Sequence, residues 1–293
     1  MNRGYAVITP ARDEADNLPR LAACLAAQTV PPDAWNIVDN GSSDGTLDIA
    51  ERIAAEHDWV RVLSIPGASA ADRGAPVVRA LLAGIAALIE PQKIIINVDA
   101  DISVGPDYFE LLVGAFDADP SLGIASGSLF EFERGTWRRR HLTGSTVVGA
   151  SRAYRWECLQ EILPFEERVA WDGLDEFKAN ALGWRTKTFA DLPIRHHRRE
   201  GARDGTAWLA RKNQGHAAYY LGYRPWYLLL RALWQARREP AAMGMVAGYA
   251  VAALRREPRS SDEYARAYLR RQQSPRNLRL RALEAAGRRR HVA

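Results

Sequence analysis

The sequence predicts an α/β protein with a doubly wound, mostly parallel sheet flanked by helices, followed by a helical C-terminal extension. Three observations support this class. Short apolar runs alternate with amphipathic segments from residue 5 to about residue 130. One run, 94–98, has Ile or Val at four of its five positions, as in an inner strand covered on both faces. Beyond residue 205 the pattern is helical and rich in aromatic residues.

The first part of the chain alternates strands and helices with short connections. The pattern is clear in its first helix, where Leu18, Leu21 and Leu25 fall on one face. This order implies a mostly parallel, doubly wound sheet. We predict strands at 5–9, 36–39, 60–63, 93–99 and 124–128, and helices at 15–29, 45–57, 74–89 and 106–116.

The pattern is mixed between residues 141 and 200. We predict helices at 152–162 and 172–182 and a strand at 185–189. Beyond residue 205, the apolar run 241–254 is too short to cross a membrane and suits a buried or interfacial helix. We therefore predict a catalytic domain at 1–204 and a helical, aromatic and arginine-rich extension at 205–293.

Composition restricts the functional class. Of 293 residues, 47% are hydrophobic and 26% are charged, as in a globular protein. Two distant cysteines, Cys24 and Cys158, argue against a disulfide framework and a cysteine zinc site, and fit a reducing compartment. We see no signal peptide and no apolar run of about 18 residues, so we expect a cytoplasmic protein. The net charge of +5 is uneven, with arginines crowded in the last third.

Two carboxylates one residue apart, Asp99 and Asp101, follow the apolar run at 94–98. Open α/β sheets bind ligands at the C-terminal ends of their strands. Two close like charges repel each other unless a cation or hydrogen-bond donors compensate them. The pair therefore indicates a divalent metal site, with an ordinary turn after a strand as the alternative.

Polar loops follow the other predicted strands as well. One contains Thr9-Pro10-Ala11-Arg12-Asp13-Glu14, and the next runs from Asp39 through Ser42 to Thr46. Arg73 precedes the third helix and could form a bidentate pair with a phosphate. Loops of this kind at helix starts can bind a nucleotide, because helix N-termini favour phosphate.

In this combination the chain resembles the family 2 glycosyltransferases, which have the GT-A fold and use nucleotide-sugar donors. Several motifs match in the family's order and spacing, which makes the resemblance more specific than any one of them. They are Thr9 to Glu14, Val38 to Thr46, Asp72 to Gly74, Val98 to Asp101, Gly149 to Arg152, Trp171 to Glu176 and Leu182 to Arg185.

The resemblance implies a role for each donor-site residue. It implies that Asp39 contacts the base, that Asp99 contacts the ribose or diphosphate, and that Asp101 holds Mg²⁺ or Mn²⁺ against the phosphates. His196 or His197 would add a ligand; adjacent strand residues point to opposite faces, so at most one serves. The implied donor-binding set is Thr9, Pro10, Ala11, Arg12, Glu14, Asp39, Ser42, Arg73, Asp99, Ala100 and Asp101, and the assigned metal ligands are Asp101, Asp99 and His197.

The resemblance also implies a catalytic base before a helix that ends in Gly-Tyr. Counting back from Gly183 by the family's spacing places the base at Asp172, with Trp171 where the family has Glu. Asp175 is the competing candidate, and capping of the helix is the structural alternative for Asp172. The base would deprotonate the acceptor hydroxyl in an inverting transfer.

We therefore predict a metal-dependent, inverting glycosyltransferase that moves one sugar from a nucleoside-diphosphate sugar, with a UDP-sugar favoured. The sequence does not identify the acceptor, for which a lipid-linked molecule and a cell-surface glycan are the candidate classes, and no nucleic-acid partner is expected. A nucleotidyltransferase is the first alternative, although Thr9 to Glu14 is not the Gly-rich loop it needs. A catalytically silent nucleotide-sugar-binding module is the second, because Trp171 alters the acidic pair.

The extension at 205–293 has three open interpretations. Its aromatic residues with flanking arginines suit peripheral contact with the cytoplasmic membrane face. A helical subdomain packed on the catalytic core and an oligomer interface are the alternatives.

Overall fold

The computed structural model describes residues 4–67, 74–90, 92–133, 135–140, 147–168, 170–198, 206–237 and 239–285. Over these residues the chain divides into two compact units. The first unit contains a β-sheet with helices on both faces, and the second contains helices alone.

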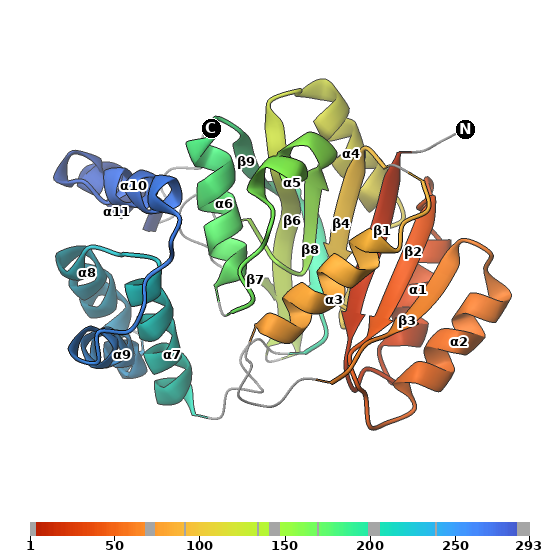
Figure 1. Ribbon diagram of the computed structural model, residues 1–293, viewed down its shortest axis with the longest axis horizontal. Coiled ribbons are helices and arrows are strands. Elements are labelled where there is room, and N and C mark those ends of the chain that lie inside the picture. The colour runs from red at the N-terminus through yellow and green to blue at the C-terminus, as the bar shows by residue number, and fades with distance from the viewer. Residues whose placement is uncertain are drawn as a thin grey trace. The chain divides into compact units, whose positions relative to one another are not determined.

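The first unit is built on a nine-stranded sheet (Figure 1). Its strands are β1 Tyr5–Ala11, β2 Ala34–Asp39, β3 Val60–Ser64, β4 Ile94–Val98, β5 Ile102–Val104, β6 Leu122–Glu133, β7 Thr136–Arg139, β8 Ser151–Arg155 and β9 Arg185–His196. Their order is β3-β2-β1-β4-β8-β6-β9-β5, with β7 paired to β6. The first four strands are parallel, whereas β8 runs antiparallel to both β4 and β6. The α/β class is confirmed, and the sheet is parallel in one half and mixed in the other.

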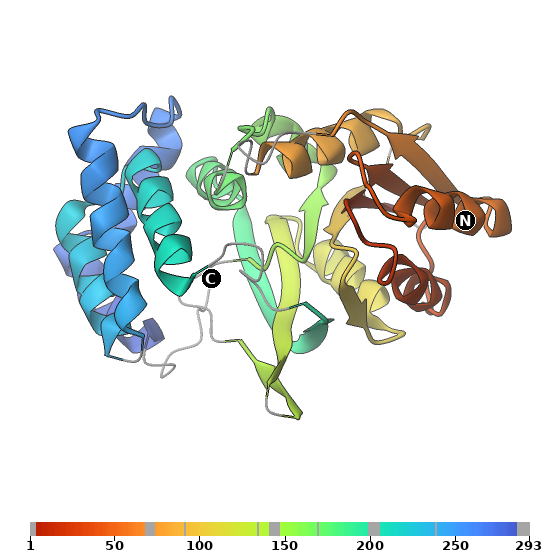
Figure 2. The same cartoon turned by 90° about the horizontal axis from the view of Figure 1, so that it is seen from below.

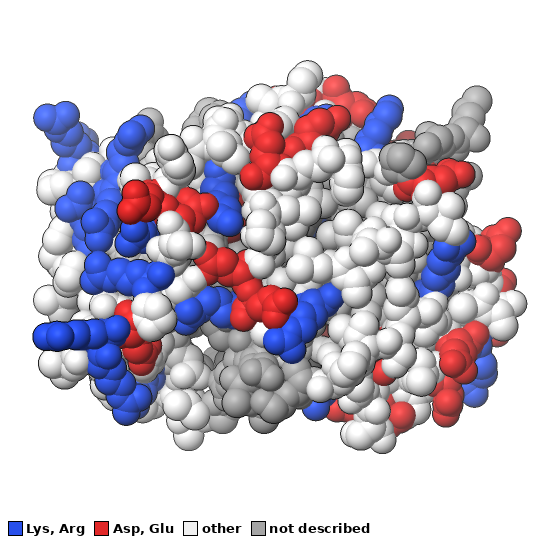
Figure 3. Space-filling model, in the orientation of Figure 1, with Lys and Arg blue, Asp and Glu red and all other residues white. Residues whose placement is uncertain are grey.

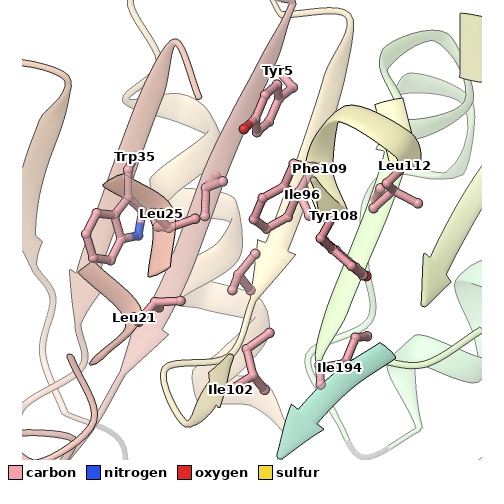
Figure 4. Close-up of a cluster of buried hydrophobic side chains, with 14 of the residues drawn as sticks. Tyr5, Leu21, Leu25, Trp35, Ile96, Ile102, Tyr108, Phe109, Leu112 and Ile194 are labelled. Atoms are coloured by element: carbon pink, nitrogen blue, oxygen red, sulfur yellow. The ribbon is translucent and has the colours of Figure 1, made fainter. Parts of the chain in front are cut away.

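Two layers of helix cover this sheet. Alternate residues of each inner strand face opposite layers, so Ile94 and Ile96 of β4 pack with one layer and Ile95 with the other. Figure 4 shows part of the first layer's core around Trp35 and Phe109. The first layer consists of α1 Leu18–Ala26, α2 Thr46–Glu56 and α4 Tyr108–Ala118, and the second of α3 Ala75–Ala86, α5 Trp156–Ile162 and α6 Trp171–Ala181.

Several predicted elements differ from the observed ones. Residues 152–155 were expected to begin a helix, but they belong to β8, and α5 starts at Trp156. The expected strand 185–189 continues through Pro193 to form the whole of β9. The short strands β5 and β7 were not predicted. These differences matter because β8 pairs with β4, and β5 pairs with the part of β9 that was not predicted and that ends in His196.

The second unit is helical. Its α7 and α9 pack with their backbones close together, as both views show for the neighbouring ribbons (Figures 1 and 2). A Cβ added at Gly215 would lie 2.1 Å from the carbonyl oxygen of Met245, and one at Gly248 would lie 2.0 Å from that of Lys212. The apolar run 241–254 therefore forms a partly buried segment. The elements are α7 Ala207–Tyr220, α8 Pro225–Ala236, η1 Pro240–Met243, α9 Gly244–Leu254, α10 Glu263–Gln272, η2 Pro275–Asn277 and α11 Leu278–Ala285.

Among the residues that the structure describes, no helix has both the length and the apolar character needed to cross a membrane.

Candidate active site

Two aspartates and a histidine converge where β4 ends. Asp99 and Asp101 follow the last residue of β4, and β9 brings His196 beside them through its pairing with β5. His196 Nε2 lies 3.1 Å from Asp101 Oδ1. One ligand atom from each of the three side chains lies within 4.8 Å of the other two. Two carboxylate oxygens and an imidazole nitrogen are a donor set that suits a divalent cation.

The protonation states of this cluster reflect its charge. Burial, with the adjacent Asp101 carboxylate, raises the pKa of Asp99 to about 6. Burial also disfavours the ionised form of Asp101, but the hydrogen bond and positive charge of His196, together with Arg198, outweigh it and lower the pKa of Asp101. Burial likewise opposes protonation of His196, yet its hydrogen bond to Asp101 raises the pKa of the imidazole. The two carboxylates thus repel each other, and His196 and Arg198 partly offset their negative charge.

Of the two adjacent histidines, the structure places His196 rather than His197 beside the aspartates. His197, the assigned ligand, is exposed, and its Nε2 lies 2.8 Å from Ser103 Oγ while its ring contacts Trp137. His196 instead points toward Asp101. The two side chains lie on opposite faces of the strand, as the alternation predicts, and the face that meets the aspartates carries His196.

The donor-side loops lie at the same edge of the sheet. Ala11 at the end of β1 pairs with Asp39 at the end of β2. Asp39 is buried, and its carboxylate accepts hydrogen bonds from the backbone N–H groups of Gly41 (3.2 Å) and Ser42 (3.3 Å). Ser42 Oγ in turn accepts from the N–H of Asp13 at 3.0 Å. The two loops are thus joined directly, at the edge where a nucleotide was expected.

Glu14 has a partner that sequence reasoning missed. Arg198 donates to both carboxylate oxygens of Glu14, at 2.8 and 2.7 Å, and its Nε lies 3.7 Å from Asp101 Oδ2. Arg198 thereby connects the first donor loop with the two-aspartate motif. No local pattern marks it, because it follows β9 and lies far from both partners in the chain.

The remaining predicted donor residues lie in different settings. Thr9 is fully buried within β1, and its hydroxyl accepts from Trp35 Nε1 at 2.9 Å, so its side chain faces the core. Pro10 and Arg12 are half-buried, and Ala11 and Ala100 are buried. Arg73 lies outside the described residues.

Helix α6 carries both candidate bases in different environments. Asp172 is half-buried in the first turn, and its Oδ2 lies 3.6 Å from the position of a Cβ at Gly149. The carbonyl oxygen of Ala150, the residue that follows Gly149, accepts a hydrogen bond from the N–H of Asp99 at 2.9 Å. Asp172 therefore lies near the end of β4 that carries Asp99 and Asp101.

Asp175, by contrast, lies in a buried ion pair. Arg152 donates to its two oxygens at 2.7 and 3.1 Å, and Tyr154 Oη donates at 2.6 Å. Burial raises the pKa of Asp175 to about 6, so it is ionised at neutral pH opposite the guanidinium. Trp171 packs in the core against Phe165. Asp172 is thus the partly exposed candidate, whereas the oxygens of Asp175 are buried and already paired.

Comparison with known proteins identifies the family. The family model described as glycosyl transferase family 2 matches residues 6–185. A polyprenol monophosphomannose synthase of Mycolicibacterium smegmatis is 32% identical over 177 residues, which are 53% of this chain and 63% of that protein. The chain thus matches less than two thirds of the length of this relative.

Solved structures agree on the fold. The mannosyltransferase PcManGT of Pyrobaculum calidifontis, in complex with GDP-Man and Mn²⁺, has a TM-score of 0.59 at 18% identity over 96% of this chain and 84% of that one. Glucosyl-3-phosphoglycerate synthase of Mycobacterium tuberculosis, in complex with Mn²⁺, UDP and glucosyl-3-phosphoglycerate, has a TM-score of 0.53 at 18% identity. The match covers 74% of this chain and 79% of that one. The fold is therefore the GT-A fold. With the match of the family model over most of the chain, it follows that this protein belongs to glycosyl transferase family 2.

Proposed function

We propose that the protein is a metal-dependent, inverting glycosyltransferase that moves a single sugar from a nucleoside-diphosphate sugar to an acceptor hydroxyl. The observation that carries this proposal is the convergence of Asp99, Asp101 and His196 at the end of β4, with Asp172 beside the same segment. Family membership supports the reaction class.

The cluster is suited to Mg²⁺ or Mn²⁺. Its carboxylates supply oxygen ligands, and the imidazole of His196 beside Asp101 can supply a nitrogen ligand. Solved relatives in complex with Mn²⁺ support the choice of a divalent ion. When bound, the ion would offset negative charge on the diphosphate leaving group.

The donor would lie along the loops after β1, β2 and β4. Asp39 is proposed to contact the base, Ser42 and the loop from Pro10 to Glu14 to line the nucleotide, and Arg73 to bind phosphate. One of the solved relatives is in complex with GDP-Man and the other with UDP. GDP-sugars and UDP-sugars are therefore both candidate donors. The family resemblance favours a UDP-sugar.

In the reaction, Asp172 would accept the proton of the acceptor hydroxyl. The hydroxyl oxygen forms a bond to the anomeric carbon while the bond between that carbon and the phosphate oxygen breaks. The electron pair of the broken bond leaves with the nucleoside diphosphate. Asp175 is not proposed as the base, since Arg152 and Tyr154 already occupy its oxygens.

The acceptor is proposed to be a glycan or a lipid-linked molecule. The match to a polyprenol monophosphomannose synthase supports the lipid-linked class. We further propose that residues 1–204 form the catalytic domain, and that the helical extension contacts the cytoplasmic face of a membrane.

A thermal-shift panel tests the donor and metal together. GDP, UDP, GDP-mannose and UDP-glucose are each added with and without Mn²⁺. At about a hundredfold excess over Kd, a bound ligand stabilises the native state by about 2.7 kcal/mol, which raises Tm by roughly 5–10 °C. At least one nucleotide should produce this shift with Mn²⁺, and Asp101→Asn should remove it. No shift with any nucleotide, or an equal shift in Asp101→Asn, would contradict the proposal.

Turnover of the donor tests the base. Release of nucleoside diphosphate from the best-bound donor is measured with water as the acceptor. Asp172→Asn should retain nucleotide binding and lose most of the turnover, by about 10²–10⁴-fold. Wild-type binding without turnover would instead indicate a silent nucleotide-sugar-binding module.

A further inference from the structure

We infer that Arg152 and Asp175 are positioning residues, which hold Asp172 at a fixed place beside the metal-binding end of β4. The inference rests on the proposed function, because it concerns the base of that reaction. It goes further by assigning a role to a buried ion pair that touches neither donor nor metal.

Arg152 joins three segments of the chain. It is fully buried on β8, where its Nε and Nη2 donate to the two oxygens of Asp175. Nη1 donates to the carbonyl oxygen of Val147, and Nη2 also donates to the carbonyl oxygen of Asp172, each at 2.7 Å. One rigid guanidinium therefore holds the first turn of α6 against β8 and the residues before it.

Asp175 anchors this guanidinium from inside the helix. Both its oxygens accept from Arg152, one of them also accepts from Tyr154, and its side chain is completely buried. Glu176 adds a second contact to the same segment, because its Oε2 accepts from the N–H of Val147 at 3.0 Å. Buried charges of this kind are costly unless paired, so the arrangement is strongly restricted to one geometry.

The same segment holds the metal-binding end of β4. On the antiparallel β8, Arg152 lies opposite Asn97. Asn97 Nδ2 donates to the carbonyl oxygen of Gly149 at 3.3 Å, and Asp99 N–H donates to that of Ala150. The carboxylate of Asp172 lies near the same residue, with Oδ2 3.6 Å from the position of a Cβ at Gly149. Any shift of α6 relative to β8 would therefore change the distance from Asp172 to the aspartate motif.

Arg152→Lys is the informative substitution. Lysine keeps the positive charge opposite Asp175, but one ammonium group lacks the planar fork that reaches Asp175, Val147 and Asp172 together. A misplacement of about 1 Å can lower a rate by about a hundredfold. We expect turnover to fall by about tenfold to a hundredfold while nucleotide binding remains unchanged.

Arg155→Lys is a matched control on the same strand. Arg155 also bonds backbone carbonyl groups, namely those of Leu122, Phe116 and Asp119. These groups belong to the β6 and α4 side, away from α6. This variant should lose comparable hydrogen bonds and stability, yet retain wild-type turnover.

A double-mutant cycle separates positioning from general damage. GDP-mannose and UDP-glucose with Mn²⁺ are the probes, with water as the acceptor, and turnover, nucleotide Kd and Tm are measured for each variant. If Arg152 acts through Asp172, adding Arg152→Lys to Asp172→Asn should lower turnover no further. A merely structural role would instead produce additive losses, in parallel with Tm.

Two outcomes would overturn the inference: full turnover in Arg152→Lys, or equal losses of turnover in Arg152→Lys and Arg155→Lys. Asp175→Asn provides the same comparison if Arg152→Lys does not fold, and full turnover in that variant would also overturn it. Failure of the proposed function looks different, because the wild type would then show no turnover or Asp172→Asn would remain active.

Discussion

At the scale of single residues, the chemistry of the site depends on which imidazole faces the aspartates. His196 presents Nε2 to Asp101, whereas its Nδ1 is buried and has no hydrogen-bond partner among the described residues. The carboxylate of Glu131 is the group that faces Nδ1, at 4.0 Å. The contact with Asp101 is thus the hydrogen bond that orients the ring.

Exchange of each histidine in turn tests this assignment. His196→Asn should weaken Mn²⁺ binding by at least about tenfold, because a ligand nitrogen is lost. His197→Asn is the matched control and should leave the affinity unchanged, since His197 faces Ser103 on the opposite side of the strand. Titration of Mn²⁺ into each protein, followed by electron paramagnetic resonance, measures the difference. Equal affinities for the two variants would contradict the assignment.

The sequence was informative about residues whose chemistry is local. Asp99 and Asp101 could be chosen as candidates because they follow an apolar strand, and Asp172 because the family resemblance implies a base at that spacing from Gly183. Arg198 and Arg152 could not, because their carboxylate partners lie 184 and 23 residues away. Thr9 shows the opposite case. The sequence motif that contains Thr9 could be recognised, but only the hydrogen bond from Trp35 in the structure shows that the Thr9 hydroxyl faces the core.

At the scale of elements, β8 shows how tertiary pairing outweighs local pattern. The residues 152–155 have side chains compatible with a helix, yet they fill the place between β4 and β6 and bond to both. The sequence of residues 152–155 alone does not indicate which two strands this segment will pair with. Apart from the three-residue β5, the alternating strands and helices before residue 130 were predictable, because each has its own periodicity.

Helical glycines provide a pair of substitutions with opposite expected signs. At Gly248 in α9 a Cβ would meet the carbonyl oxygen of Lys212, so Gly248→Ala should destabilise the second unit by about 1–3 kcal/mol. At Gly114 in α4 a Cβ would meet no atom within 4 Å, so Gly114→Ala should stabilise its helix by about 0.5–1 kcal/mol. Urea unfolding of both variants measures the difference. Stabilisation by Gly248→Ala would contradict the close packing of α7 and α9.

At the scale of the whole molecule, charge is divided between the two parts of the sequence. Residues 205–293 contain 18 Lys and Arg against 5 Asp and Glu, whereas residues 1–204 contain 22 against 30. On the face that Figure 3 shows, blue side chains crowd over the helices of the second unit. A strongly basic surface favours an anionic partner.

Helix α8 adds an apolar face to this basic unit. Leu228 and Ala232 are buried in the core of the unit, whereas Leu229, Leu230 and Leu233 on the other side are 42–50% exposed. Arg237 lies over the ring of Trp234 at the end of the helix. Exposed leucines bordered by arginine and tryptophan suit the surface of an anionic membrane better than a nucleic acid, which has no apolar layer to receive them.

Vesicle binding tests this membrane contact with a closely matched pair of substitutions. The intact protein should sediment with vesicles that contain anionic lipid, and binding to vesicles of neutral lipid alone should be weaker. Leu233→Glu should reduce the partition coefficient by roughly tenfold or more, since burying one leucine contributes about 1.5–3 kcal/mol. Leu111→Glu on α4 is the control, because Leu111 is 50% exposed like Leu233 but lies in the first unit. Equal losses in both variants would contradict a specific role for α8. If Leu233→Glu instead lowers the mass of the protein in vesicle-free solution, the α8 face is an interface between copies of this chain, since a charge placed in a buried apolar contact would separate them.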